Sequence, residues 1–264
     1  MIIEKLRNSL AILYFFWFGK TFGRGYERYK INLIKKKIKK KIDNNLGEYF
    51  DERIVEIPWI VEELKKSKGN LLDVGSTINC EYIIDELSNL KNIFISTLYP
   101  EKIYFNNKSI NYLYEDICDN SLKNKFFDNI SCISTLEHIG FDNSQYNYTK
   151  TSKKFSKINE LMYLKALKEI KKLLKSSGKF FITIPFGKKK IYKNLQQFGH
   201  SELKKIFLIF KEYERKVIYY KFDKRKWKSC DENDCRNIEP LVKNNDKKFV
   251  LSANSVALIK FYKK

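Results

Sequence analysis

The chain has 264 residues, of which 43% are apolar, and its 52 Lys and Arg residues outnumber 31 Asp and Glu residues. This composition excludes an intrinsically disordered protein, and the length suits one α/β domain with additions or two small domains. The formal net charge of +21 favours an anionic partner such as nucleic acid, an acidic membrane surface or a phosphorylated substrate. A genome rich in A and T explains the charge equally well, because Ile, Asn, Phe, Tyr and Lys are abundant together.

Positive charge is concentrated in the N-terminal segment, because residues 1–42 contain 12 Lys or Arg and 2 Glu. The apolar run at residues 9–18 is shorter than the roughly 20 residues that cross a bilayer. Ile residues recur every three or four positions over residues 31–42, which predicts a helix with one apolar stripe among lysines. One hypothesis is peripheral contact of residues 1–42 with an anionic membrane. The alternative is a helix packed on the rest of the protein, with its lysines in solvent.

From residue 51 onward the sequence alternates between helix and strand patterns. Helices are predicted at 53–67, 77–90, 161–178 and 201–213, and strands at 69–75, 92–97, 110–117, 126–135, 179–185, 215–222 and 255–263. Pro58 is expected in the first turn of its helix, Gly178 as a C-terminal cap and Ser201 as an N-cap. The alternation predicts a doubly wound, mostly parallel sheet with an antiparallel finish in residues 51–264, after a basic helical extension in residues 1–50.

The five cysteines are scattered and odd in number, which argues against a disulfide framework and for a reducing compartment such as the cytoplasm. Cys230 and Cys235 form one close pair, and no second pair follows at the spacing of a zinc site. Two thiols in a loop are therefore favoured over a metal centre, and no metal is predicted.

Polar residues follow the predicted strands at the positions where an open parallel sheet binds its ligands, beyond the carboxyl ends of the strands. In strand order these are Asp73, Gly75 and Ser76; Thr97; Glu115 and Asp116; Ser134, Thr135, Glu137 and His138; and residues 185–187. A glycine in the first turn allows a ligand to approach the backbone. The sequence therefore predicts a polar, acid-containing binding site along this edge of the sheet.

Four stretches of the chain, LLDVGS, YEDI, FDNISCISTLEHIG and ALKEIKKLLKSSGKFFITIPFG, follow one another in this order. They resemble the successive motifs of class I S-adenosylmethionine-dependent methyltransferases, most closely the small-molecule and glycan-type members. The resemblance runs from about Glu52 to Lys264. It implies a Rossmann-like sheet of seven strands with the last strand antiparallel, S-adenosylmethionine as the cofactor, and a small molecule or glycan as the acceptor.

The resemblance also implies roles for residues at the sheet edge. The methionine and ribose side of the cofactor would meet Asp73, Gly75 and Ser76, the ribose position would fall at Thr97, the adenine would meet Asp116 and Ile117, and Ser134, Thr135 and Glu137 would border the sulfonium and the acceptor. Residues 76–79 lack the further glycines that the motif usually has, and Thr97 stands where an acid usually holds the ribose hydroxyls. A charge-assisted contact contributes roughly 1.5–3 kcal/mol, so a non-catalytic relative with this fold is an alternative.

His138 has the side chain best suited to remove a proton from an acceptor near neutral pH. The hypothesis is that His138 acts as a general base or orients the acceptor hydroxyl, with Glu137 near the cofactor. The alternative is that both residues only make hydrogen bonds at the start of a helix. His200, the other histidine, is expected in a loop beside a helix start. Acceptor specificity is expected to depend on residues 141–157 and 186–200.

The favoured function is methylation of an oxygen atom of a small molecule or sugar, for example in surface-polysaccharide assembly, where membrane contact would suit a lipid-linked glycan. The alternatives are a non-catalytic protein with this fold and a nucleic-acid-directed methyltransferase or binder. Nucleic acid is the less favoured partner, because the sequence has no RNP-like motif, no zinc finger and no NPPY-type tetrapeptide for amino-group methylation. The protein is expected in the cytoplasm, with peripheral membrane contact as a further hypothesis.

Overall fold

A computed structural model describes residues 30–38, 51–100, 103–105, 109–143, 158–224, 226–245 and 248–263 of the chain. The chain divides into two units, residues 1–43 and residues 44–264, and each is described by itself. In the first unit, residues 30–38 form a helix in the region where the spacing of isoleucines predicted one. The apolar run at 9–18 lies outside the described residues. No helix in the described part of the chain is both long and apolar enough to cross a bilayer.

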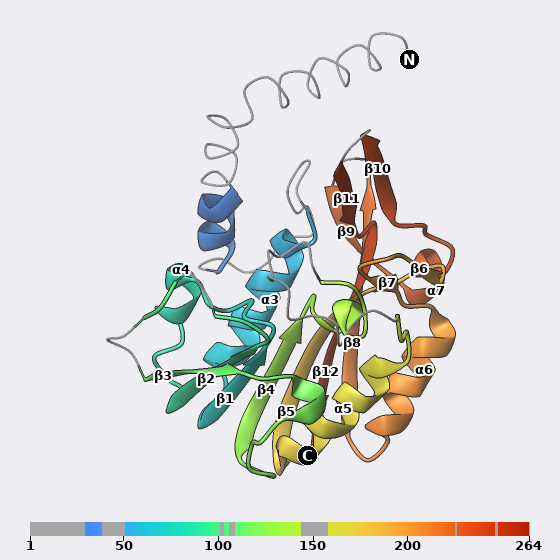
Figure 1. Cartoon of the computed structure of the whole chain (residues 1–264). Helices are drawn as coiled ribbons and strands as arrows, with labels where there is room; N and C mark the ends of the chain where they lie inside the picture. Colours follow the sequence, from blue (N-terminus) through green and yellow to red (C-terminus); the bar gives the residue numbers. More distant parts are fainter. Residues whose placement is uncertain are drawn as a thin grey trace, which may run out of the picture. The chain divides into compact units, whose positions relative to one another are not determined.

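Eight strands of the second unit form one mixed sheet. They are β1 (Asn70–Val74), β2 (Asn92–Thr97), β3 (Ile110–Tyr114), β4 (Phe127–Ile133), β5 (Leu174–Pro185), β8 (Glu214–Asp223), β9 (Lys226–Cys230) and β12 (Ser255–Tyr262). Their order is β3-β2-β1-β4-β5-β12-β8-β9 (Figure 1). Neighbours among β1 to β5 pair in parallel, whereas β12 is antiparallel to β5 and β8, and β9 is antiparallel to β8. The predicted parallel sheet with an antiparallel finish is confirmed. The described sheet has eight strands instead of seven, because β9 adds an edge beyond β8.

Helices cover both faces of this sheet (Figure 1). They are α3 (Arg53–Lys65), α4 (Glu81–Ile84), α5 (Met162–Leu173), α6 (His200–Ile209) and α7 (Glu232–Cys235). Successive residues of a strand point to opposite faces, and β5 follows this rule. Phe181 packs edge-on against Trp59 of α3, while Phe180 stacks on Phe210 at the end of α6. The middle of the sheet is therefore buried between two helical layers.

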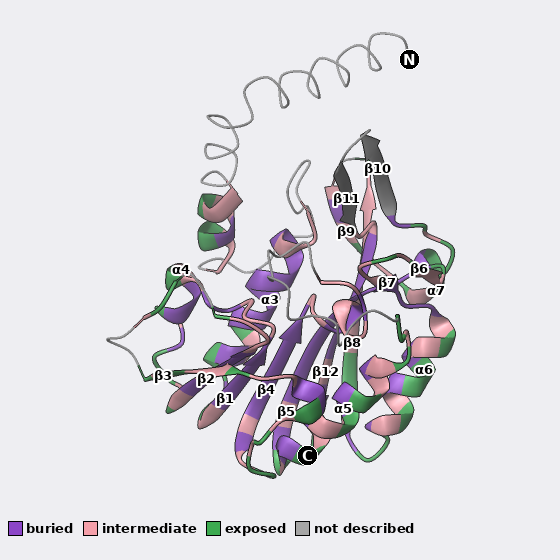
Figure 2. Cartoon of the chain, in the orientation of Figure 1, coloured by how far each residue is buried: buried purple, intermediate pink, exposed green. Residues whose placement is uncertain are grey.

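The two central strands, β4 and β5, are buried along most of their length (Figure 2). Ile130 and Cys132 of β4 and Ile182 of β5 have no exposed surface. Strands that are covered on both faces read as continuous apolar runs, which is why the sequence predicted both. This rigid core fixes the carboxyl ends of β1, β4 and β5 beside one another.

Several predicted element boundaries are wrong. Pro58 lies in the interior of α3, because the helix already begins at Arg53. The helix predicted at 77–90 is reduced to the single turn of α4. Gly178 lies inside β5 and caps no helix, since α5 ends at Leu173 and the backbone is extended from the next residue onward. Gly199 precedes α6 in place of Ser201, and its N–H donates to the Glu202 carboxylate at 3.1 Å.

Short elements between the long ones escaped the sequence analysis altogether. They are the 3₁₀ turns η1 (Ile117–Asp119) and η2 (Leu136–His138), the hairpin of β6 (Lys190–Ile191) with β7 (Gln196–Gln197), and the hairpin of β10 (Leu241–Asn245) with β11 (Lys248–Ser252). The segment between the last two predicted strands, at 215–222 and 255–263, therefore contains β9, α7 and a hairpin. Most of the long polar segment at 141–157 lies outside the described residues.

Candidate functional site

The turn after β1 has a backbone that favours glycine. Gly75 has a φ of +100° and Ser76 a φ of +61°, both in the left-handed region. The Gly75 N–H donates to the Ser96 carbonyl of β2 at 2.8 Å. A Cβ atom added at Gly75 would overlap the Thr135 side chain at the end of β4. Glycine is therefore required both by the conformation and by the close approach of β4.

Asp73 holds this turn from inside the protein. Its carboxylate has no exposed surface, and its two oxygens accept hydrogen bonds from the Ile78 N–H at 2.9 Å and from the Ser131 hydroxyl at 2.6 Å. Such bonds to an ionised group are the strong ones. The structure thus places Asp73 as a support of the turn, beneath Gly75 and Ser76.

The next two strand ends carry the other residues assigned to the cofactor. Thr97 is half-buried at the end of β2. Asp116 follows β3 and its Oδ1 accepts from the Cys118 N–H at 2.8 Å, which starts η1 and leaves Ile117 buried behind it. Because β1, β2 and β3 are neighbours in the sheet, these residues lie along one edge with the turn at Gly75.

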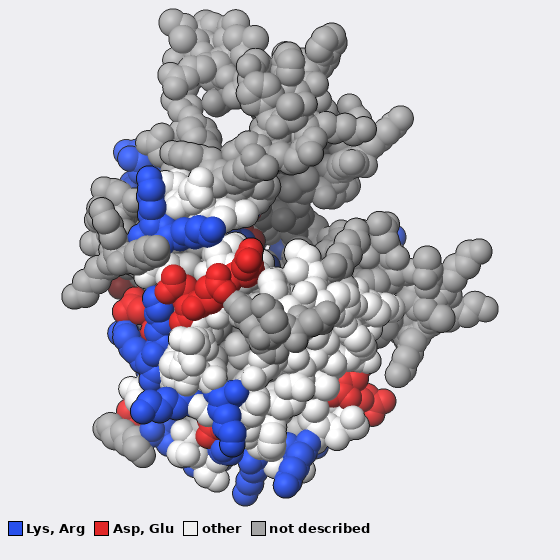
Figure 3. Space-filling view, turned by 90° about the vertical axis from the view of Figure 1, so that its left-hand side faces the viewer, with Lys and Arg blue, Asp and Glu red and all other residues white. Residues whose placement is uncertain are grey.

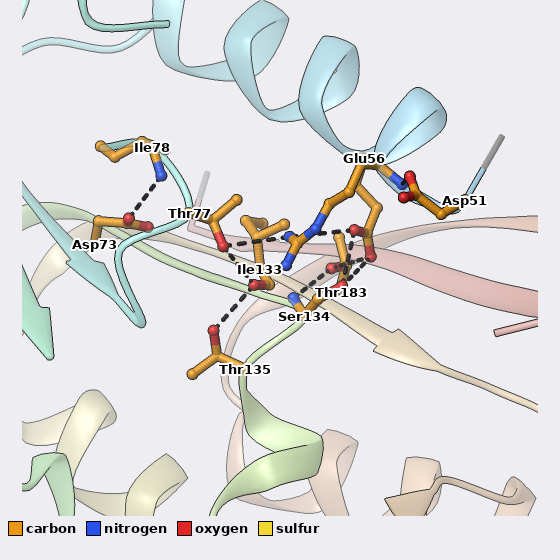
Figure 4. A network of polar contacts seen from close by, with 10 residues as sticks. Asp51, Glu56, Asp73, Thr77, Ile78, Ile133, Ser134, Thr135 and Thr183 are labelled. Carbon is orange, nitrogen blue, oxygen red and sulfur yellow. Dashed lines mark hydrogen bonds and ion pairs between the residues drawn. The ribbon is translucent and has the colours of Figure 1, made fainter. Parts of the chain in front are cut away.

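A buried carboxylate on α3 ties together the ends of β4 and β5 (Figure 4). Glu56 has no exposed surface and accepts from the Ser134 hydroxyl at 2.7 Å and from the Thr183 hydroxyl at 2.6 Å. The Thr183 hydroxyl oxygen in turn accepts from the Ser134 N–H at 3.0 Å. Ser134 has a φ of +43°, a strained value for a residue other than glycine. The network therefore fixes Ser134 in a conformation that it would otherwise rarely adopt.

Arg53 extends this network to the turn after β1 (Figure 4). Its Nη1 lies 3.5 Å from the Glu56 Oε2 and 3.3 Å from the Thr77 hydroxyl oxygen. Thr77 itself donates to the Ile133 carbonyl at 2.9 Å. The sequence analysis missed Arg53 and Glu56. The one signal for them is a charged residue inside the apolar stretch RIVEIPWI, which packs on the sheet.

Two further carboxyl groups near Arg53 have a buried oxygen without a hydrogen-bond partner among the described residues, namely Oε2 of Glu52 and Oε2 of Glu137. Burial, reinforced by the nearby Glu56, raises the pKa of Glu137 to about 8 and that of Glu52 to about 7. At neutral pH the Glu137 carboxyl is therefore mostly protonated and can donate a hydrogen bond. Unsatisfied buried polar groups are few in folded proteins and mark places where a ligand or water fits.

His138, in η2, is held in one tautomer. Its Nδ1 lies 2.9 Å from the Asn194 carbonyl oxygen. A carbonyl oxygen can only accept, so Nδ1 carries the proton and Nε2 is the acceptor nitrogen of the neutral ring. Burial lowers the pKa of His138 below its ordinary value. The imidazole is therefore neutral at physiological pH and has the form that a general base needs.

Side chains of the segment after β5 serve mainly to hold the fold. Gln196 and Gln197 are buried, and their amide groups donate to backbone carbonyls, including that of Ile238 at 2.8 Å. His200 begins α6 and pairs with Glu232 at 2.5 Å. Within the described residues, no group of three or more His, Cys, Asp and Glu side chains is placed to hold a metal ion.

No protein-family model matches the chain, and no curated protein matches its sequence. Solved structures with a similar fold include 1,6-didemethyltoxoflavin-N1-methyltransferase of Burkholderia thailandensis with bound S-adenosylhomocysteine, at a TM-score of 0.49 and 10% identity over 81% of this chain and 80% of that one. The YcgJ protein of Bacillus subtilis has a TM-score of 0.46 and 11% identity, over 79% of this chain and 98% of its own. The N-methyltransferase NodS of Bradyrhizobium japonicum, in complex with S-adenosylhomocysteine, has a TM-score of 0.42 and 11% identity, over 89% and 98%.

At these identities and scores, the similar structures do not assign an activity or a substrate to this chain. The strand order does define the class of fold. Five parallel strands are followed by β12, which lies antiparallel between β5 and β8. This is the Rossmann-like fold of the class I S-adenosylmethionine-dependent methyltransferases, the fold that the resemblance of the sequence motifs implies.

Proposed function

We propose that this protein is an S-adenosylmethionine-dependent methyltransferase that methylates a hydroxyl oxygen of a small molecule or sugar. The observation that carries the proposal is the left-handed backbone of Gly75 and Ser134, at the adjoining ends of β1 and β4, together with the neutral imidazole of His138 in the turn after β4. Strained conformations persist where surrounding structure enforces them, and they cluster at functional sites. The buried network of Arg53 and Glu56 holds Ser134 in its strained conformation.

The residues at the strand ends fit S-adenosylmethionine. Gly75, with a φ of +100°, gives this turn its left-handed backbone, and its lack of a Cβ atom lets the Thr135 side chain approach the turn. The residues that would hold the cofactor are Gly75 and Ser76 at the methionine side, Thr97 at the ribose, Asp116 and Ile117 at the adenine, and Ser134 and Thr135 at the sulfonium. Asp73 would act by supporting the turn, since both of its oxygens already accept hydrogen bonds. The bound cofactor supplies an electrophilic methyl group.

His138 would supply the base that an oxygen acceptor needs. A hydroxyl oxygen becomes a good nucleophile only as its proton leaves, and a positioned base assists this step. The bond from Nδ1–H to the Asn194 carbonyl keeps Nε2 as the atom that takes the proton. It also stabilises the protonated ring that results, because the donor then carries a positive charge.

The buried carboxyl groups support a polar acceptor. Glu137, protonated at neutral pH because its pKa is about 8, can donate a hydrogen bond from a site where water is excluded. Oε2 of Glu52 provides a second polar atom without a partner among the described residues. A sugar, with its many hydroxyl groups, satisfies such atoms better than an apolar molecule does. Assignment to surface-polysaccharide assembly is a proposal that rests on the likeness of the sequence motifs.

Calorimetric titration of S-adenosylmethionine and S-adenosylhomocysteine into the full chain tests the cofactor. We expect dissociation constants on the order of micromolar, which corresponds to about 8 kcal/mol of binding free energy. Absence of binding at millimolar ligand would support the alternative, a protein with this fold and no catalysis.

Transfer of a labelled methyl group to a panel of monosaccharides, nucleotide sugars and small hydroxylated molecules then tests the acceptor. With an acceptor in hand, His138→Gln is expected to lower kcat by about 100-fold or more while the cofactor binds as before. A loss of only a few-fold would show that His138 is no base. Tyr192→Phe, a change in the same loop as Asn194, is the control for disturbance of that loop.

Two further parts of the proposal concern location and partners. Peripheral contact of residues 1–42 with an anionic membrane, from the cytoplasm, is tested by flotation with anionic liposomes, and deletion of this segment should abolish it.

A nucleic-acid partner stays the weaker candidate. On the face shown in Figure 3, a band of Asp and Glu lies beside the Lys and Arg residues, so the described residues of that face form no uniformly basic track for a phosphate backbone.

A further inference from the structure

Two thiols face each other at the edge of the sheet, away from the strand ends that form the site. Cys230 is the last residue of β9 and Cys235 the last of α7, and their Sγ atoms lie 3.3 Å apart. Cys235 has no exposed surface, whereas Cys230 is half-buried. Solvent therefore reaches the Cys230 thiol, whereas the Cys235 thiol is accessible only to the Cys230 sulfur.

The backbone around both thiols is fixed by other contacts. Cys230 pairs with Tyr219 in the register of β9 with β8. The helix α7 is anchored through Glu232, which accepts from the Tyr219 hydroxyl at 3.2 Å and pairs with His200 and with Arg236. Both sulfur atoms are consequently held beside each other by structure that does not depend on a bond between them.

The surroundings also make Cys230 the more reactive thiol. The hydrogen bond from Cys235 lowers the pKa of Cys230, and the nearby Lys221 acts in the same direction. Burial has the opposite effect elsewhere, because it raises the pKa of the Cys118 thiol to about 12 and that of Cys132 well above the ordinary value. A thiolate is the nucleophile in exchange with disulfides, so exchange is expected first at Cys230.

We propose that Cys230 and Cys235 form a reversible intramolecular disulfide by exchange with a low-molecular-weight disulfide such as oxidised glutathione. The Cys230 thiolate attacks one sulfur of the small disulfide and releases one glutathione thiolate. The Cys235 sulfur attacks the Cys230 sulfur of the mixed disulfide, the bond between Cys230 and glutathione breaks, and the leaving glutathione sulfur takes the Cys235 proton. Two protein thiols are oxidised to one disulfide, and one glutathione disulfide is reduced to two thiols.

The two cysteines are connected to the candidate site through the chain that follows Cys235. Beyond Cys235 the chain reaches Ile238, whose carbonyl accepts from the Lys188 N–H at 3.0 Å and from the Gln197 amide at 2.8 Å. Both donors belong to the segment of the β6 and β7 hairpin. The same hairpin carries Asn194, whose carbonyl holds the His138 ring.

Peptide mass spectrometry on the folded, full-length protein tests the proposal. Trypsin cuts after Lys228 and Arg236, so both cysteines lie in one peptide, residues 229–236. After exposure to oxidised glutathione and blocking with iodoacetamide, we expect this peptide without alkyl groups and lighter by two hydrogen atoms than the reduced peptide. Dithiothreitol should restore two alkylated cysteines. Formation should be at least about tenfold faster in the folded protein than in urea, because folding places the thiols together.

Single variants give the matched controls. Cys230→Ser should leave Cys235 unmodified, because that thiol is buried, and Cys80→Ser should leave the disulfide unchanged. A peptide that carries two alkyl groups after oxidation would overturn the proposal. So would a lasting glutathione adduct on Cys230, or equal rates of disulfide formation in the folded and the denatured chain.

Discussion

The two sides of the candidate site differ in how their buried polar groups are satisfied. On the side of β1, both oxygens of Asp73 accept hydrogen bonds from groups within the protein. On the side of β4 and β5, Glu52 and Glu137 each have a buried oxygen without a partner among the described residues. Burial of an unpaired polar group costs stability. The Asp73 carboxylate is therefore fully paired within the protein, while the other side holds polar atoms that a bound acceptor would satisfy.

The largest loss of stability is expected from Glu56→Ala, which removes the carboxylate at the centre of the polar network on the side of β4 and β5. The change leaves the Arg53 guanidinium without its partner and the Ser134 and Thr183 hydroxyls without an acceptor. We expect a loss of about 3–5 kcal/mol in the free energy of unfolding, measured with urea. Glu62→Ala, at an exposed ion pair on the same helix, should change it by less than about 1 kcal/mol. Equal effects of the two changes would contradict the stabilising role of Glu56 in this network.

The next effect is the pH dependence of stability that Glu137 confers. Its pKa is raised from 4.5 to about 8 on folding, so the folded protein keeps a proton that the unfolded chain has lost. The stabilisation is therefore present below about pH 4.5 and is lost as the pH rises through about 8. Glu137→Gln, which keeps the shape without the charge, should be about 4–5 kcal/mol more stable than the wild type near pH 9 and equal to it near pH 4. Denaturation at both pH values measures this.

Controls keep that test specific. Glu81→Gln removes one negative charge from an exposed position of α4 and accounts for the change in net charge. A lower stability of Glu137→Gln at high pH would show that the buried Glu137 carboxyl has hydrogen-bond partners in the folded protein.

On the β1 side, Gly75→Ala is expected to weaken cofactor binding by about 100-fold and to lower the free energy of unfolding by about 1–3 kcal/mol. The cause is the φ of +100° together with the overlap of the new Cβ with Thr135. Calorimetry of S-adenosylhomocysteine binding measures the first effect. Gly199→Ala is the control, because its Cβ would come no closer than 3.0 Å to the flexible Glu202 carboxylate. Unchanged binding in Gly75→Ala would place the cofactor elsewhere.

The smallest expected effect is a gain in affinity for the cofactor. Thr97 offers a hydroxyl where a carboxylate would accept two hydroxyl groups, and such a contact contributes roughly 1.5 kcal/mol or more. Thr97→Asp is therefore expected to tighten cofactor binding by about tenfold, while Thr97→Val, which keeps the shape without the hydroxyl, should weaken it. Weaker binding in Thr97→Asp would argue that the ribose does not lie at the end of β2.

Much of the fold is predictable from sequence because the signals for it are local. The pattern of NIFIST gives the bounds of β2 as the structure has them, and the continuous apolar runs give β4 and β5. The helix predicted at 77–90 fails because contacts outside the segment hold its first residues in a turn: the Ile78 N–H donates to Asp73, and the Thr77 hydroxyl donates to the carbonyl of Ile133, 56 residues away. Local propensity is overridden by tertiary contacts in such places.

The site is predictable only in part, for a related reason. The strand ends locate Gly75, Asp116 and His138, because parallel strands present their carboxyl ends at one edge. Glu56, in contrast, meets Thr183 at a separation of 127 residues in the chain. The Asn194 carbonyl that fixes the tautomer of His138 is 56 residues away from it. No spacing within one segment of sequence records such contacts.

The edge strand β9 carries one more consequence. An outermost strand exposes unpaired N–H and C=O groups to any other extended chain, and stacking of such edges leads to aggregation. In β9, Trp227 is buried, while Lys226 and Lys228 on either side of it are partly exposed. A second molecule that approached this edge would have to displace water from these two side chains and disturb the ion pair of Lys228 with Asp223. The lysines that make the protein basic thus also keep the end of its sheet from recruiting copies of itself.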